Sequence, residues 1–167
     1  GFGGMTFKKV YFCPLRQRPV SESVKAADLI VNESATDLSN AKRVTHKIEM
    51  TPALLKRMQL LGIYRDIDLG TPMPTQPDAL KQAEKEQQGV TQGSTRPEDR
   101  DHGIYECYCE ADIKGFEHKW KGKVSGLEIP WRVTIDISTK KILSIVRNYP
   151  KPQGAELPEK RRTFVKY

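Results

Sequence analysis

The residues best suited to chemistry are two cysteines separated by one residue, Cys107 and Cys109, and the histidines His102 and His118 that flank them. Thiolates and imidazoles are good zinc ligands, and residues i and i+2 of a strand share a face. Zinc knuckles, however, space their cysteines by two to four residues and bring a second such pair, which this sequence lacks. We therefore predict structural, buried thiols, in line with the burial of most free cysteines.

Other catalytic patterns are equally sparse. A nucleophilic serine or cysteine needs a histidine and an acid placed by a recognisable turn, and the sequence has no Gly-x-Ser-x-Gly motif. The opening Gly1-Phe2-Gly3-Gly4 lacks the Lys-Ser/Thr ending of a phosphate-binding loop. The aspartate pairs Asp66/Asp68 and Asp99/Asp101 are typical of turns. We predict no catalytic residue, no metal site and no cofactor, and we interpret the chain as not an enzyme.

Basic clusters are the remaining candidates for binding. The formal net charge of +7 favours a polyanion such as nucleic acid, and Phe7 and Trp120, which lie in or beside such clusters, are suited to base stacking. The clusters nevertheless fall in turns and at strand ends, where charged residues simply face water. Nucleic-acid binding is therefore the less favoured alternative, and no nucleic-acid-binding residue is assigned. The clusters are Lys8-Lys9, Arg16 with Arg18, Lys42-Arg43, Lys119 with Lys121 and Lys123, Lys140-Lys141, and Lys160-Arg161-Arg162.

The segment 129–149 is the centre of the structure that must position these residues. Trp131, Val133 and Ile135 alternate with polar residues up to Asp136, which predicts a strand with the apolar set buried and the polar set wet. A second apolar stretch at 142–146 follows a turn at about 137–141, so the two halves form an antiparallel hairpin. An isolated hairpin is marginal in water, so the rest of the chain must cover it.

Further strands are predicted on both sides of this hairpin. In 43–50, His46 lies on the apolar side of the strand, so we predict a packed or hydrogen-bonded core histidine. We interpret 114–126 as a polar loop. The other predicted strands are 7–12, 20–24, 28–32, 104–110 and the terminal stretch 162–167.

One helix is predicted after the strand 43–50. Thr51 supplies an N-cap hydroxyl, Pro52 suits the first helical position, and Gly62 ends the helix. An apolar stripe should pack on the sheet, and the opposite side should face water. The stripe is Leu54, Leu55, Met58 and Leu61, and the wet side is Lys56, Arg57 and Gln59.

Together these elements predict one α+β domain over residues 1–167, mostly antiparallel sheet with one packed helix at about 52–61. We interpret the Pro/Gln/Glu-rich segment 70–102 as a flexible insertion, because it has too little apolar surface to offset its ordering entropy. Three cysteines, including Cys13, suit a reducing compartment. No apolar run is long enough for a membrane span. From the opening Gly we expect either a piece of a longer chain or a cloning remnant, and the strand-like ending favours a fragment.

In their order along the chain, several stretches resemble the portal proteins of short-tailed bacteriophages and related prophages. Each stretch alone is a weak signal, but the ordered set covers nearly the whole chain outside 70–102. The stretches are Val10-Tyr11 with Cys13–Leu15, Arg18–Glu22, Ala27–Asn32, Ala35–Leu38, Arg43–His46, the helix starting at Thr51-Pro52, Gly62–Asp66, Glu106–Glu117, Ile129–Asp136, Ile142–Tyr149 and Arg161–Tyr167.

The resemblance implies an internal section, from the outer wing region, of a structural subunit of a dodecameric ring at one capsid vertex of the virion. Such rings form in the bacterial host cytoplasm, nucleate head assembly, dock the terminase and the tail adaptors as a head–tail connector, and pass DNA during packaging and ejection. The implied partners are other portal subunits, capsid, terminase and adaptor proteins and DNA, with no membrane. Without the channel segments, the fragment alone can remain monomeric. The alternative is a nucleic-acid-binding module of a larger replication or packaging protein.

Overall fold

The structure, a computed structural model, describes residues 6–31, 41–73, 96–150 and 157–166. Its largest element is a five-stranded antiparallel sheet with the strand order β3-β4-β5-β8-β9. The predicted α+β fold, mostly antiparallel sheet with one helix, is thereby confirmed. The strands of this sheet are β3 (Leu29–Val31), β4 (Arg43–Met50), β5 (His102–Ala111), β8 (Ile129–Asp136) and β9 (Ile142–Arg147).

The central hairpin has the predicted form. Strands β8 and β9 pair antiparallel around a turn at residues 137–141, with an irregularity in the register between Thr134 and Ile135. On the side away from β9, β8 pairs with β5, the longest strand of the sheet, and this pairing joins the hairpin to the rest of the sheet.

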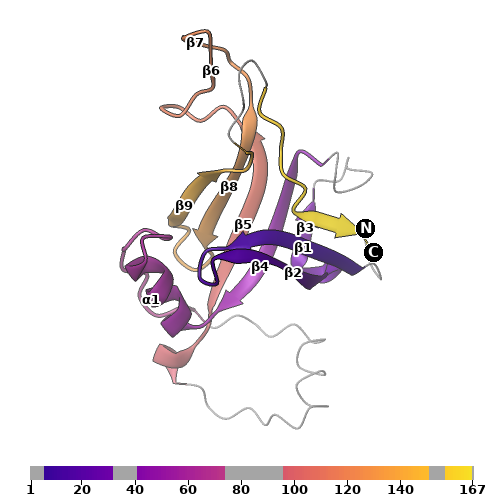
Figure 1. The fold of residues 1–167 in the computed structure, drawn as a ribbon. Helices are drawn as coiled ribbons and strands as arrows, with labels where there is room; N and C mark the ends of the chain where they lie inside the picture. Colours follow the sequence, from indigo (N-terminus) through magenta and orange to yellow (C-terminus); the bar gives the residue numbers. More distant parts are fainter. Residues whose placement is uncertain (1–5, 32–40, 74–95, 151–156, 167) are drawn as a thin grey trace.

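A second sheet of three strands lies across the first (Figure 1). Strand β1 (Thr6–Cys13) is its centre, with β2 (Arg18–Lys25) on one side and β10 (Phe164–Lys166) on the other, both antiparallel to it. The two ends of the described chain therefore meet in one small sheet. Two short 3₁₀ helices, Ala26–Asp28 and Pro97–Asp99, precede β3 and β5.

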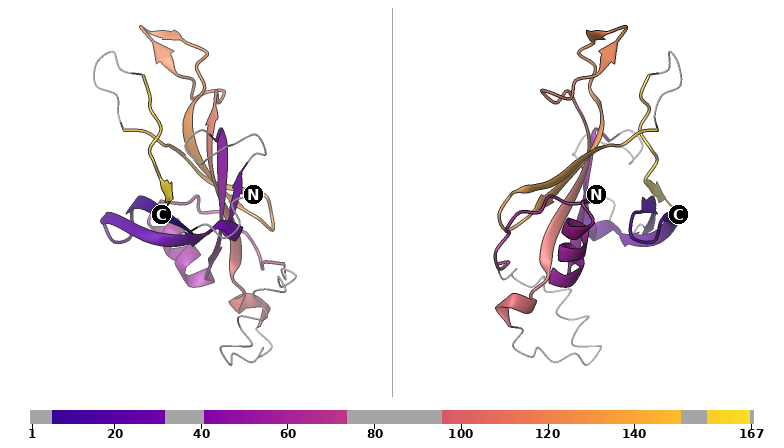
Figure 2. Two further views of the ribbon diagram at one scale, coloured as in Figure 1. Left: turned by 90° about the vertical axis from the view of Figure 1, so that its right-hand side faces the viewer. Right: turned by 60° about the vertical axis from the view of Figure 1, so that its left-hand side comes forward.

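Both covering layers pack on the same face of the five-stranded sheet, which we call the inner face (Figure 2). On β5 this face carries His102, Ile104, Glu106 and Tyr108, which are all buried. Helix α1 (Pro52–Leu60) covers one end of it and the three-stranded sheet covers the middle. The opposite face, which we call the open face, carries Tyr105, Cys107 and Cys109 on the same strand.

Helix α1 begins and ends as the sequence predicts. The Thr51 hydroxyl accepts a hydrogen bond from the Leu54 amide at 3.2 Å, and Gly62 follows the helix with a φ of +74°, a left-handed conformation that suits glycine. Leu55 and Met58 pack into the main core.

Two residues of the helix do not lie where the periodicity placed them. Gln59, predicted to face water, is buried and donates hydrogen bonds to the carbonyls of Arg65 and Ile67, because the chain after the helix folds back over it. Leu61, predicted on the apolar stripe, is exposed because it follows the last helical turn.

The polar side of β8 is not wet, contrary to the prediction. Thr134 and Asp136 are fully buried, because they belong to the inner face. Trp131 is buried as predicted, on the other face, in a small cluster with Ile129 and Tyr149. Strand β8 is therefore covered on one face along its length and on the other at its start.

The predicted loop at 114–126 contains a short hairpin at the tip of an extension from the sheet (Figure 1). Strands β6 (Lys119–Trp120) and β7 (Lys123–Val124) pair through Lys121 and Gly122, both with positive φ, as a type I′ turn requires.

Of the predicted insertion 70–102, residues 74–95 lie outside the described residues. The last residue of that range, His102, is buried and opens β5, so the ordered sheet starts within the predicted insertion. No helix among the described residues is long and apolar enough to cross a membrane.

Candidate functional site

The most unusual group of side chains is an ion-pair cluster buried between the two sheets. Lys9 of β1 donates to the Glu106 carboxylate of β5, and its ammonium lies 3.2 Å from His46 Nδ1 of β4. Lys9 is 3% exposed, Glu106 is 9% exposed and His46 is 5% exposed, so all three are buried. We call this group the inter-sheet cluster.

The burial of Lys9 contradicts the prediction that both lysines of the Lys8-Lys9 pair face water. We expected the Lys8-Lys9 pair to face water at a strand end, but only Lys8 is exposed. Lys9 lies on the side of β1 that faces the large sheet, where an unpaired charge would be very costly. Glu106 supplies the opposite charge, and the Tyr11 ring lies 4.8 Å from the ammonium.

His46 is a buried, hydrogen-bonded core histidine, as predicted. Burial lowers the His46 pKa to about 4, and the Lys9 charge lowers it further than Glu106 raises it. The imidazole is therefore neutral at pH 7, and in the tautomer protonated at Nε2 its Nδ1 accepts a hydrogen bond from the Lys9 ammonium.

Aromatic rings close the inter-sheet cluster. The Phe164 ring of β10 meets both the His46 ring and the Tyr108 ring edge to face, with centroids 5.8 and 5.1 Å apart. Burial raises the pKa of Tyr108, so its phenol stays protonated. Because its members are sealed from solvent, the cluster is suited to holding the two sheets together and not to reacting with a substrate.

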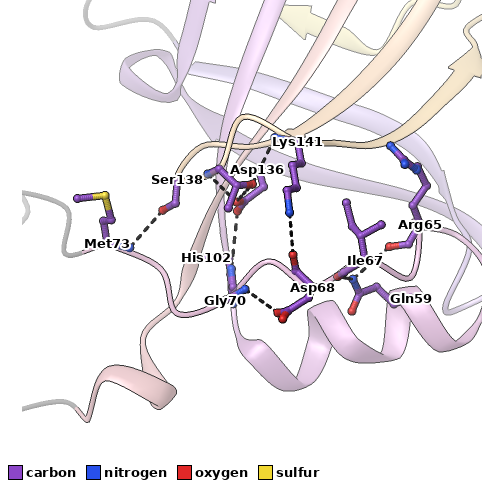
Figure 3. A network of polar contacts seen from close by, with 11 residues as sticks. Gln59, Arg65, Ile67, Asp68, Gly70, Met73, His102, Asp136, Ser138 and Lys141 are labelled. Carbon is purple, nitrogen blue, oxygen red and sulfur yellow. Dashed lines mark hydrogen bonds and ion pairs between the residues drawn. The ribbon is translucent and has the colours of Figure 1, made fainter.

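A second buried polar group lies beneath the β8–β9 turn (Figure 3). His102 Nδ1 is 3.7 Å from Asp136 Oδ1, and neither atom has a hydrogen-bond partner. The other carboxylate oxygen, Asp136 Oδ2, accepts from the amide and hydroxyl of Thr139 and so fixes the turn.

The chain after helix α1 is hydrogen-bonded to the same turn and to the start of β9. The Lys141 ammonium donates to the Asp68 carbonyl at 3.1 Å, and the Met73 amide donates to the Ser138 hydroxyl at 3.2 Å (Figure 3). Arg65 also donates to the Ile142 carbonyl at 3.1 Å. A pocket of about 360 Å³ lies beside His102 and is lined partly by Asp66 and Asp68. Across the described ranges, no three His, Cys, Asp or Glu side chains are placed to hold a metal ion.

The four residues weighed as zinc ligands lie in three places. His102 is on the inner face of β5, whereas Cys107 and Cys109 are on its open face. His118 is in the extension, where its Nδ1 lies 2.6 Å from the Ser125 hydroxyl.

The prediction that Cys107 and Cys109 are buried is wrong. Both thiols are only half-buried, although Cys109 packs against the small cluster of Ile129, Trp131 and Tyr149. Hydrogen bonding from the Cys109 thiol, and then from Thr45, lowers the Cys107 pKa to about 6 although burial opposes it. The same pairing raises the pKa of Cys109.

Only some of the basic clusters come together. Lys42 and the run Lys160-Arg161-Arg162 line one pocket of about 460 Å³, while Arg132 and Arg147 join Arg161 in lining another of about 610 Å³. Sequence reasoning missed Arg132 and Arg147, because neither lies in a run of basic residues. Lys119, Lys121 and Lys123 lie at the tip of the extension, and Lys140 and Lys141 lie in the β8–β9 turn.

The fold is an α+β domain with charged side chains buried between its two larger sheets, and the open face of the five-stranded sheet is covered only in part. No protein-family model and no curated protein matches the chain.

Proposed function

We propose that this chain is a structural section of a portal subunit of a short-tailed bacteriophage or prophage, part of the vertex ring that passes DNA and docks the terminase and tail adaptors. The single observation that carries the proposal is the ordered set of sequence stretches that resemble that family. Among the residues that the structure describes, these stretches include much of strands β1, β2, β4, β8 and β9, so they lie largely in the two larger sheets.

The open face supports a role in an assembly. It presents a row of cross-strand neighbours, Ile30, Thr45, Cys107, Val133 and Ile145. Ile30 is 52% exposed and Ile145 is 39% exposed, so the row has apolar ends that the described chain leaves in contact with water. Exposed isoleucines on a sheet face that is covered only in part are compatible with a contact to another protein. In a ring, the occupant would be a neighbouring subunit.

Electron microscopy of the complete protein that contains this sequence tests the proposal. Portal subunits should form rings with an axial hole wide enough for duplex DNA. A discrete monomer or dimer at micromolar concentration would refute the portal proposal.

Two variants of the complete protein test which surfaces make the ring. Ile145→Glu should reduce ring formation, because it places a charge on the open face. Val124→Glu, at a more exposed site on the extension (59% against 39% for Ile145), is the control and should assemble normally. Replacement of both Lys140 and Lys141 by Glu tests the basic turn in the same way, and normal rings would exclude that turn as a contact.

The alternative, a nucleic-acid-binding module, is favoured by one observation. The pocket that joins Arg132, Arg147 and Arg161 also has Tyr11 and Phe12 in its wall, and none of the described residues that line it is Asp or Glu. Binding to phosphates would fall steeply with salt, in proportion to the number of phosphates neutralised. A fluorescence-anisotropy titration with single-stranded DNA at 50 and 200 mM salt separates the two functions, because the portal section should bind weakly at both.

A further inference from the structure

Cys107 and Cys109 form a pair of thiols that the fold presents together. They are consecutive same-face residues of β5, so their Cα atoms are separated by about 6.6 Å and their side chains rise from the sheet in parallel. Both are half-buried and free. The third cysteine, Cys13, is at the end of β1 in the other sheet and has no such neighbour.

The residues around the cysteine pair limit which metal ions it can bind. The cross-strand neighbours of Cys107 are Thr45 and Val133, and those of Cys109 are Arg43 and Trp131. None of these four is a carboxylate or an imidazole, so the described chain adds no third ligand of the kind that zinc requires. Two thiolates alone suit a soft ion that accepts two sulfur ligands, of which Cu(I) is the physiological example.

We propose that Cys107 and Cys109 form a two-thiolate site for a soft monovalent cation of the Cu(I) class on the open face of the sheet. Each thiol releases its proton to solvent as its sulfur bonds to the ion, and no electron is transferred. The bound unit has a net charge of −1, which the guanidinium of Arg43 offsets from the neighbouring strand.

The strand geometry favours a bridging ion over a disulfide. A spacing of about 6.6 Å between the two Cα atoms is at the long end of the range that disulfides tolerate, and the two Cβ bonds point the same way along the sheet normal. A metal ion between the sulfurs spans this distance without moving the backbone. The inference is independent of the proposed function, because it uses only the single chain.

Anaerobic titration of the 167-residue chain with Cu(I), in competition with the chromogenic chelator bicinchoninate, tests the site. One equivalent should bind, and Cys107→Ser and Cys109→Ser should each weaken binding at least tenfold, since each leaves one thiolate. Cys13→Ser is the matched control and should bind like the unchanged chain. Absence of binding, or equal loss in all three variants, would overturn the proposal.

A second probe keeps the proposal testable if a serine variant misfolds. Phenylarsine oxide condenses with two neighbouring thiols and releases one water, so the folded chain should gain one phenylarsenic group by native mass spectrometry. The Cys13→Ser chain should gain the same group. Labelling that is absent from the unchanged chain, or lost in the Cys13→Ser chain, would refute the pairing of Cys107 with Cys109.

Discussion

Replacing Lys9 by Met should destabilise the domain severely although it makes the residue more hydrophobic. Methionine keeps most of the length of the lysine stem but removes the ammonium that serves both Glu106 and His46. Glu106 would then be a buried carboxylate without its counter-charge. Removing one partner of a buried ion pair costs about 3–5 kcal/mol. Domains of this size typically have an unfolding free energy of about 5–15 kcal/mol, so about a fifth or more of the stability is at stake.

The assay is equilibrium unfolding in urea followed by far-UV circular dichroism at pH 7. The matched control is Lys8→Met, one residue away on the exposed side of the same strand, which should change the unfolding free energy by less than about 1 kcal/mol. The contrast between neighbouring lysines isolates burial from the loss of a positive charge.

A double variant identifies the cause. Lys9→Met combined with Glu106→Gln leaves no charge in the inter-sheet cluster, so it should be more stable than Lys9→Met alone. The coupling energy from the double-mutant cycle should exceed about 1 kcal/mol. Equal losses for Lys9→Met and Lys8→Met, or strict additivity with Glu106→Gln, would refute the account of the cluster.

Three further outcomes follow from the same structure. The His46 pKa is about 4 in the folded chain and near 6.5 in the unfolded chain, so between these pH values only the unfolded chain gains a proton. The unfolding free energy should therefore fall by up to about 3 kcal/mol as the pH drops from 6.5 to 4. In urea titrations, His46→Gln should remove this pH dependence and His118→Gln should not. Leu143→Ala, at a fully buried site, should cost about 2–5 kcal/mol, whereas Ile145→Ala on the open face of the same strand should cost less than about 1 kcal/mol, and similar losses would contradict the assignment of faces. Iodoacetamide at pH 7 should label Cys107 faster than Cys13 in a peptide-mass time course, and Cys109→Ala should slow it, whereas unchanged rates would exclude the thiol–thiolate pairing.

Local signals in the sequence predicted the elements well. The N-cap at Thr51, the glycine at Gly62 and the alternation around the 137–141 turn each depend on residues within one turn or one strand, so a short window contains the information. The limits of the helix and of the central hairpin follow from them.

The buried polar groups could not be predicted in this way. Lys9 and Glu106 are 97 residues apart, so the sequence around either residue does not indicate that the two form an ion pair. In β8, the alternation separates two sets of side chains but does not say which set the covering layers will meet. The apolar set was the natural choice, and the polar set with Thr134 and Asp136 is the one that faces helix α1 and the small sheet.

Strand β5 also buries polar side chains on the inner face, beside Ile104 and Tyr108. Its inner face buries His102 and Glu106, which require partners, while its open face offers Tyr105 and two cysteines to water. A lone domain would gain stability from the opposite arrangement, because apolar burial is favourable and buried charge is costly. The arrangement is reasonable if the open face is also buried, against another chain. The amphipathic pattern of β5 and β8 would then suit the assembled protein, which is the state that the portal proposal requires and that the Ile145→Glu variant tests.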